Sequence, residues 1–263
     1  MVEQMVVSSG KSVVAKSANS GKPLAVQTLR SISAEDSIKR IKTGFIDLDD
    51  VLGGGILPGG VILIAGQPGI GKSTLLLQVS ANVARELPVL YVSGEESASQ
   101  VKLRAERLGA EKSEQLNFAA STSADDIAAT IRGNDYKLII IDSIQTLMLE
   151  EITSAPGTVS QITNSSNVII RAAKQSGAAV VLVGHVTKEG SIAGPKVLEH
   201  LVDVVLQFEG DRYGGFKVVR AAKNRFGSTN EAAIFEMNEE GLNLVENPSA
   251  ALLAERQNED GSV

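Results

Sequence analysis

Eight consecutive residues, from Gly66 to Ser73, have the types and the spacing of a phosphate-binding loop. They read GQPGIGKS and fit the pattern G-x-x-x-x-G-K-[ST] at every fixed position. Gly66 and Gly71 permit backbone conformations that side chains would block, so successive N–H groups can converge on phosphate oxygens. Lys72 is a cation for the β- and γ-phosphates, and the Ser73 hydroxyl is a ligand for Mg²⁺. The motif predicts a nucleoside triphosphate site, with contacts from Gly66, Gln67, Pro68, Gly69, Ile70, Gly71, Lys72, Ser73 and Thr74.

The alternative is a glycine-rich turn that merely precedes a helix. An apolar run at residues 61–65 comes directly before the motif, and a helix-like segment follows at residues 75–87. This order of strand, loop and helix favours the phosphate-binding interpretation.

Asp142 ends the aliphatic run of residues 138–141. A carboxylate in that place suits the carboxyl edge of a parallel sheet, where ligands bind, better than the middle of a strand. We therefore expect Asp142 to act with Ser73 in holding the metal ion. An ordinary aspartate at the end of a strand is the alternative.

Two glutamates and a histidine follow other predicted strands. Glu95 and Glu96 come after residues 89–92, where a carboxylate is placed to take a proton from the attacking water. Either glutamate would also stabilise the start of the next helix, and the residues alone leave the choice open. His185 follows residues 178–183. It is either a neutral sensor of the γ-phosphate or a polar residue that marks the end of its strand.

The centre of the chain alternates apolar, β-branched runs with helix-like segments. This alternation is typical of a parallel sheet covered on both faces, which is an α/β architecture. We expect strands at residues 61–65, 89–92, 116–119, 138–141 and 178–183, and helices at 75–87, 97–108, 124–132 and 159–175. The later runs at 202–208, 216–222, 232–236 and 242–245 are joined by short Gly or Asn turns, and they predict an antiparallel extension of the same sheet.

Composition excludes several classes of protein. The 263 residues are 43% hydrophobic and 21% charged, which is typical of a globular chain, and there is no cysteine for a disulfide, a thiol nucleophile or a Cys-ligated zinc site. No apolar run approaches the roughly 20 residues of a membrane span, so we expect a cytoplasmic protein without membrane contact. The net charge of −6 requires any nucleic acid to bind at a local basic surface. We predict a flexible arm at residues 1–26, one ATPase domain at 27–256 and a disordered tail at 257–263.

Taken together, the motifs resemble the ATPase core of the bacterial RadA (Sms) family, which is related to RecA and to DnaB-type helicases. The resemblance covers residues 40 to 256, and its most specific element is KNRFG at residues 223–227. The other matching segments are IKTG at 41–44, LGGG at 52–55, the loop at 66–73, YVSGEES at 91–97, IDSIQT at 141–146, APG at 155–157, GHVTKEG at 184–190 and AGP at 193–195. The family's four-cysteine zinc finger and its Lon-protease-like domain are not matched within these 263 residues.

The resemblance implies a RecA-like fold and a DNA-dependent ATPase that uses ATP and Mg²⁺. It implies a hexameric ring on single-stranded DNA that promotes branch migration in recombinational repair, with recombinases or helicases as partners. The resemblance identifies Glu95, rather than Glu96, as the catalytic glutamate. It also implies that Lys223 and Arg225 are the basic residues that complete a neighbouring subunit's site. The loops that carry Lys188 and Lys196 correspond to those that face DNA in the channel of the ring.

Two other functions are open. One is a nucleotide-gated regulatory ATPase that resembles KaiC-type proteins and acts through protein contacts without DNA. The other is an inactive binding subunit, which intact Lys72, Ser73, Glu95 and Asp142 argue against. ATP-dependent assembly without DNA affinity would distinguish the regulatory protein from the DNA-dependent one.

Overall fold

The structure is a computed structural model that describes residues 26, 28, 39–185, 197–210 and 215–246. The chain divides into two units, Met1–Ser37 and Ile38–Val263, and every described helix and strand belongs to the second unit. Apart from Val26, the predicted arm at residues 1–26 lies outside the described residues, and so does the predicted tail at 257–263. These two predictions, and the domain boundaries between them, stay predictions.

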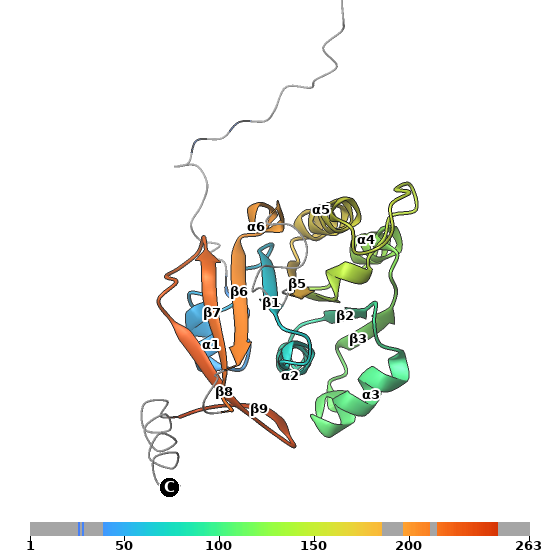
Figure 1. Cartoon of the computed structure of the whole chain (residues 1–263). Coiled ribbons are helices and arrows are strands. Elements are labelled where there is room, and N and C mark those ends of the chain that lie inside the picture. Colours follow the sequence, from blue (N-terminus) through green and yellow to red (C-terminus); the bar gives the residue numbers. More distant parts are fainter. Residues whose placement is uncertain (1–25, 27, 29–38, 186–196, 211–214, 247–263) are drawn as a thin grey trace, which may run out of the picture. The chain divides into compact units, whose positions relative to one another are not determined.

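The second unit is built on one nine-stranded sheet (Figure 1) in the order β3-β2-β4-β5-β1-β6-β7-β8-β9. The first six strands of this order run parallel, and β6 to β9 pair antiparallel. The predicted mostly parallel sheet with an antiparallel C-terminal extension is therefore confirmed. The strands are β1 (Val61–Gly66), β2 (Val89–Ser93), β3 (Leu116–Ala120), β4 (Leu138–Asp142), β5 (Ala179–His185), β6 (Val204–Gly210), β7 (Lys217–Asn224), β8 (Ala232–Asn238) and β9 (Gly241–Leu244).

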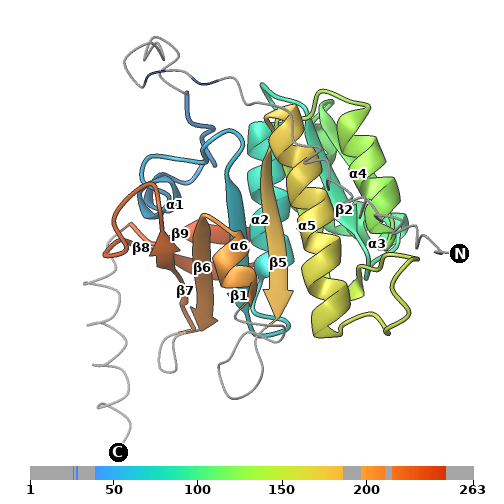
Figure 2. The ribbon, with the colours of Figure 1, turned by 90° about the horizontal axis from the view of Figure 1, so that it is seen from above.

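Helices cover both faces of the sheet, and each face has its own apolar cluster. Along β1, Ile62 and Ile64 pack with α1 and α2, whereas Leu63 packs with α4 and α5. Figure 2 shows α5 running along β5. Because the inner strands are buried on both faces, they read as uninterrupted apolar runs in the sequence. The helices are α1 (Ile46–Val51), α2 (Lys72–Val83), α3 (Ala98–Arg107), α4 (Ala124–Arg132), α5 (Val159–Ser176) and α6 (Val197–Leu201), with 3-10 turns at Ala110–Lys112 and Ile144–Thr146.

Three differences from the sequence-based elements have local causes. The helix after the phosphate-binding loop begins at Lys72, because Gly71 in a left-handed conformation is its N-cap, and it ends at Val83 with Ala84 as its C-cap. The short helices α1 and α6 have six and five residues, too few to show an apolar period in the sequence. No helix in the described part of the chain is long and apolar enough to cross a membrane.

Candidate nucleotide site

The phosphate-binding loop connects β1 to the N-terminus of α2. Gly69 and Gly71 have φ values of 76° and 118°, conformations that side chains rarely adopt. Within the described residues, no acceptor takes the backbone N–H groups of Gly69, Gly71, Lys72, Ser73 and Thr74. A row of free N–H groups at the start of a helix is an anion site, and it fits a polyphosphate.

The motif suggests that Gly66 is a glycine because its backbone adopts a conformation that side chains would block, but the structure gives a different reason. The φ of Gly66 is not positive, and a Cβ at this position would lie 2.4 Å from the carbonyl oxygen of Phe208 in the neighbouring strand β6. The first glycine of the loop therefore permits the close approach of two strands.

The Lys72 side chain is held inside the site. It is 4% exposed, and its Nζ donates to the carbonyl oxygens of Gly66 (2.8 Å) and Gln67 (2.9 Å). The same Nζ lies 3.2 Å from Nδ1 of His185 at the end of β5. Burial lowers the pKa of the Lys72 ammonium, and the nearby carboxylates of Asp142 and Glu95 oppose that shift.

His185 bridges Lys72 and Glu95. Because an ammonium only donates, we assign Nδ1 as the acceptor and Nε2–H as the donor, and Nε2 lies 3.3 Å from Oε1 of Glu95. The same glutamate oxygen accepts a hydrogen bond from the Ser143 hydroxyl, directly after β4. The ends of three strands thus bring a cation, an imidazole and a carboxylate into one chain of contacts.

Glu96 has a different environment from Glu95. Arg104 of α3 binds both of its carboxylate oxygens, with Nη1 2.7 Å from Oε2. A bidentate pair of this kind fixes the carboxylate. Among the described residues, the Glu95 carboxylate pairs instead with a hydroxyl and an imidazole, and this geometry supports Glu95 over Glu96 as the base.

Asp142 lies at the end of β4, level with Ser93 at the end of β2. Its Oδ2 accepts a hydrogen bond from the Tyr91 hydroxyl at 2.7 Å, while no described residue donates to Oδ1. Burial, and then the charge of Asp142, raise the pKa of Tyr91 well above its usual range, so the phenol stays a donor. A carboxylate and the Ser73 hydroxyl are oxygen ligands of the kind that Mg²⁺ prefers, so the residues fit this ion.

One cavity of about 430 Å³ joins these groups. Its lining includes the predicted residues Lys72, Ser73, Thr74, Glu95, Asp142 and His185, together with Arg104 and Arg107 of α3. Three groups of the site were not predicted from the sequence: the hydroxyls of Tyr91 and Ser143, which contact Asp142 and Glu95, and Arg107, which lines the cavity. The phenol in the run of residues 89–92 was the one visible signal, since a buried tyrosine needs a partner for its hydroxyl.

Lys223 and Arg225 lie far from their own cavity. They flank the end of β7, which pairs with the start of β6 at the amino edge of the parallel strands. Lys223 Nζ donates to the carbonyl oxygens of Glu199 (2.6 Å) and Val202 (2.8 Å), and Arg225 forms an ion pair with Asp203. The length of β1, about 17 Å at 3.3 Å per residue, separates this edge from the loop. Lys188 and Lys196, the predicted DNA contacts, lie outside the described residues.

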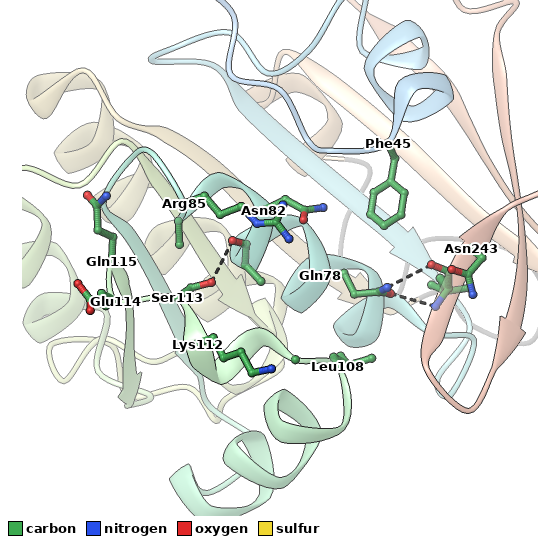
Figure 3. A pocket seen from close by; sticks show the side chains of 14 residues that line it. Phe45, Gln78, Asn82, Arg85, Leu108, Lys112, Ser113, Glu114, Gln115 and Asn243 are labelled. Atoms are coloured by element: carbon green, nitrogen blue, oxygen red, sulfur yellow. Dashed lines mark hydrogen bonds between the residues drawn. The ribbon is translucent and has the colours of Figure 1, made fainter.

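A second cavity, of about 620 Å³, lies between α2, the segment of residues 108–115 and β9 (Figure 3). None of the predicted site residues lines it. Here Gln78 reaches from α2 to β9, where it accepts from the Leu242 N–H (3.0 Å) and donates to its carbonyl (3.1 Å). This amide holds the antiparallel extension against the helix that follows the phosphate-binding loop.

The chain is similar to known proteins along most of its length. Residues 28–191 match the family described as AAA domain. The chain is 50% identical over 237 residues to the DNA repair protein RadA of Pseudomonas aeruginosa, covering 90% of this chain and 52% of the relative. The corresponding proteins of Halalkalibacterium halodurans and Bacillus subtilis are each 50% identical, covering 97% and 88% of this chain and 56% and 52% of the relatives. The chain thus spans about half the length of the relatives that it matches.

A crystal structure of the RadB recombinase superposes with a TM-score of 0.63 at 23% identity, covering 78% of this chain and 100% of that chain. This likeness confirms the RecA-like fold. The matches in sequence cover 90% or more of this chain for two of these relatives, so they include both the phosphate-binding loop at residues 66–73 and KNRFG at residues 223–227. The chain therefore belongs to the AAA domain family, and it corresponds to the ATPase core of the RadA DNA repair proteins.

Proposed function

We propose that this chain is a Mg²⁺-dependent ATPase of recombinational DNA repair that single-stranded DNA stimulates and that works as a hexameric ring. The observation that carries the proposal is the single cavity lined by Lys72, Ser73, Glu95 and Asp142. These four side chains suit phosphate binding, metal binding and general-base catalysis. The names of the similar proteins support DNA repair as the setting.

Binding uses the free N–H groups at the start of α2. The phosphate oxygens accept from Gly69, Gly71, Ser73 and Thr74, where the helix dipole also favours negative charge. Lys72 exchanges the carbonyl oxygens of its own loop for the β- and γ-phosphates. This exchange breaks the Lys72 contact with His185, so the imidazole changes its partners when the γ-phosphate is bound.

Ser73 and Asp142 would hold Mg²⁺. When bound, this ion supplies positive charge that neutralises the β- and γ-phosphate oxygens.

Hydrolysis uses Glu95 as the general base. Its carboxylate takes a proton from a water molecule whose oxygen bonds to the γ-phosphorus, and the bond between that phosphorus and the β–γ bridging oxygen breaks. The products are ADP and inorganic phosphate. Ser143 and His185 both contact Oε1 of Glu95, so they orient the carboxylate.

A neighbouring subunit completes the site with Lys223 and Arg225. The support is their place at the amino edge of the sheet, about 17 Å from their own loop, which is too far for either side chain to reach its own cavity. A cation from the neighbour would stabilise charge on the transferred phosphoryl group, so hydrolysis would depend on assembly.

DNA binding is assigned to the loops that carry Lys188 and Lys196. With a net charge of −6, one subunit offers weak attraction for DNA, and a ring repeats each lysine around its channel. Repeated cycles of hydrolysis on the bound strand would then promote branch migration.

The first test measures ATP turnover with and without single-stranded DNA over a range of salt concentrations. We expect DNA to increase turnover and Lys72→Ala to abolish it. If the rate of ATP turnover is the same with and without DNA at every salt concentration, the DNA-dependent function is contradicted. ATP-dependent assembly in the same samples would then favour the KaiC-like alternative.

The second test mixes two inactive variants, Glu95→Ala and Lys223→Ala. Partial recovery of turnover in the mixture is expected, because some interfaces combine an intact Glu95 with an intact Lys223. No recovery despite confirmed co-assembly would refute the site built from two subunits.

A further inference from the structure

Tyr91 connects the aromatic packing of one sheet face to the candidate metal carboxylate. Its side chain is 1% exposed, and its ring stacks on Phe118 of the neighbouring strand at 6.5 Å between centroids and 23° between planes. The ring also belongs to the apolar cluster that packs against α2. The packed ring therefore fixes the position of the hydroxyl, because a buried tyrosine side chain has few rotamers available.

The strand register explains how this hydroxyl reaches Asp142. Tyr91 pairs with Ile140 across β2 and β4, two residues before the level at which Ser93 pairs with Asp142. The long side chain spans this step, and its hydroxyl lies 2.7 Å from Oδ2 of Asp142. Oδ1 of the same carboxylate has no donor among the described residues, and Asp142 lines the cavity with Ser73.

We propose that Tyr91 is a positioning residue for the metal site. Its hydroxyl donates a hydrogen bond to Oδ2 of Asp142 and so orients the carboxylate with Oδ1 toward the bound cation. The proposal rests on the proposed Mg²⁺-dependent ATPase function. It follows the general rule that the partners of a metal-binding carboxylate orient it, and that loss of such a partner weakens metal affinity by about 10- to 100-fold.

A purely structural role for Tyr91 is the competing explanation. A buried hydroxyl needs an acceptor, and Asp142 is the acceptor at hand. The two explanations differ in one measurable quantity. A structural hydrogen bond affects folding stability, whereas a positioning bond also changes the affinity for the metal.

The experiment compares the whole chain with its Tyr91→Phe variant, using Mn²⁺ as the probe for the metal. Titration of Mn²⁺ into the ADP-bound protein, followed by electron paramagnetic resonance, gives the metal affinity without any turnover. ADP affinity is measured separately in EDTA. We expect Mn²⁺ affinity to fall by about tenfold while ADP affinity in EDTA stays within twofold, because the backbone cradle is untouched. An unchanged Mn²⁺ affinity would overturn the proposal.

Two further variants make the result specific. Phe118→Leu replaces the stacked ring by another apolar side chain, while the Tyr91 ring stays in its apolar cluster and its hydroxyl stays on Asp142, so Mn²⁺ affinity is expected to match the unaltered protein. A tenfold loss in this variant would assign the effect to packing and overturn the role of the hydroxyl. In the Asp142→Asn background, Tyr91→Phe is expected to add no further loss, since the carboxylate that it positions is gone. A fully additive double variant would show that Tyr91 acts on the site in another way.

The outcome also separates this proposal from the proposed function. If the unaltered chain binds no Mn²⁺ with ADP, the proposed metal-dependent function fails. If it binds Mn²⁺ and Tyr91→Phe binds equally well, only the positioning role is lost. A lower melting temperature for Tyr91→Phe with unchanged metal affinity would assign the hydroxyl to folding alone.

Discussion

Replacement of Arg225 by alanine separates a role in a neighbour's active site from a role in the fold. Nη1 of Arg225 lies 2.9 Å from Oδ1 of Asp203, and the two side chains are 55% and 10% exposed. The other oxygen of Asp203 accepts from the Val61 N–H at 3.0 Å, at the start of β1. The arginine is thus half exposed, and the carboxylate keeps one partner when the arginine is removed.

The expected loss of folding stability is small. Solvent screens a half-exposed guanidinium, so the ion pair contributes at most about 1 kcal/mol to the free energy of unfolding. A domain with an unfolding free energy of about 5–15 kcal/mol remains folded after such a loss. A cation that completes a phosphoryl-transfer site, by contrast, contributes about 10³- to 10⁵-fold to the rate. The two roles therefore differ by orders of magnitude in turnover.

The assay measures ATP turnover at saturating single-stranded DNA and the thermal midpoint of the same sample. Arg225→Ala is expected to lower turnover at least a hundredfold and the midpoint by a few degrees. Asp203→Asn is the matched control, since it breaks the same ion pair and keeps the arginine. If Asp203→Asn loses as much turnover as Arg225→Ala, or if Arg225→Ala keeps most of its turnover, the role in the neighbour's site is refuted.

Three other changes test the site from different sides. Gly66→Ala places a methyl group 2.4 Å from the carbonyl oxygen of Phe208, and such overpacking is expected to lower the free energy of unfolding by about 1–3 kcal/mol in chemical denaturation. Glu95→Gln is expected to lower turnover by about 10²- to 10⁴-fold with ATP binding retained, whereas Glu96→Gln should change turnover far less; equal losses in a steady-state assay would contradict the assignment of the base. Gln78→Ala removes two hydrogen bonds to β9 and should lower the unfolding free energy by about 1–3 kcal/mol, and an unchanged thermal midpoint would show that β9 needs no such anchor.

The clustering of the site residues was predictable from the sequence because of one rule about parallel sheets. Lys72, Asp142 and His185 each follow an apolar run, and the ends of parallel strands meet at the same edge. That rule places the residues at one edge whatever the order of the strands. The structure agrees, since these three residues line the same cavity.

The contacts inside the site were not predictable in the same way, because they depend on which strands are neighbours. The bridge from Lys72 through His185 to Glu95 requires β5 beside β1, with β4 and β2 next in order. The Tyr91 hydroxyl meets Asp142 because β2 and β4 are paired. These neighbouring strands are separated in sequence by one or more helices and, for β1 and β5 and for β2 and β4, by other strands as well. An apolar run does not indicate which strand it pairs with.

The pairing of β1 with β6 also links the two edges that the proposed ring brings together. At the carboxyl edge, Gly66 packs against Phe208 of β6, and at the amino edge the Val61 N–H donates to Asp203, which forms an ion pair with Arg225. One strand pair therefore contacts both the start of the phosphate-binding loop and the segment that carries the basic residue. Close-packed strands transmit strain along their length. A substitution at Gly66 that shifts β1 against β6 is therefore expected to lower turnover in the ring at two sites: the nucleotide site of the same subunit, and the neighbour's site that Arg225 completes.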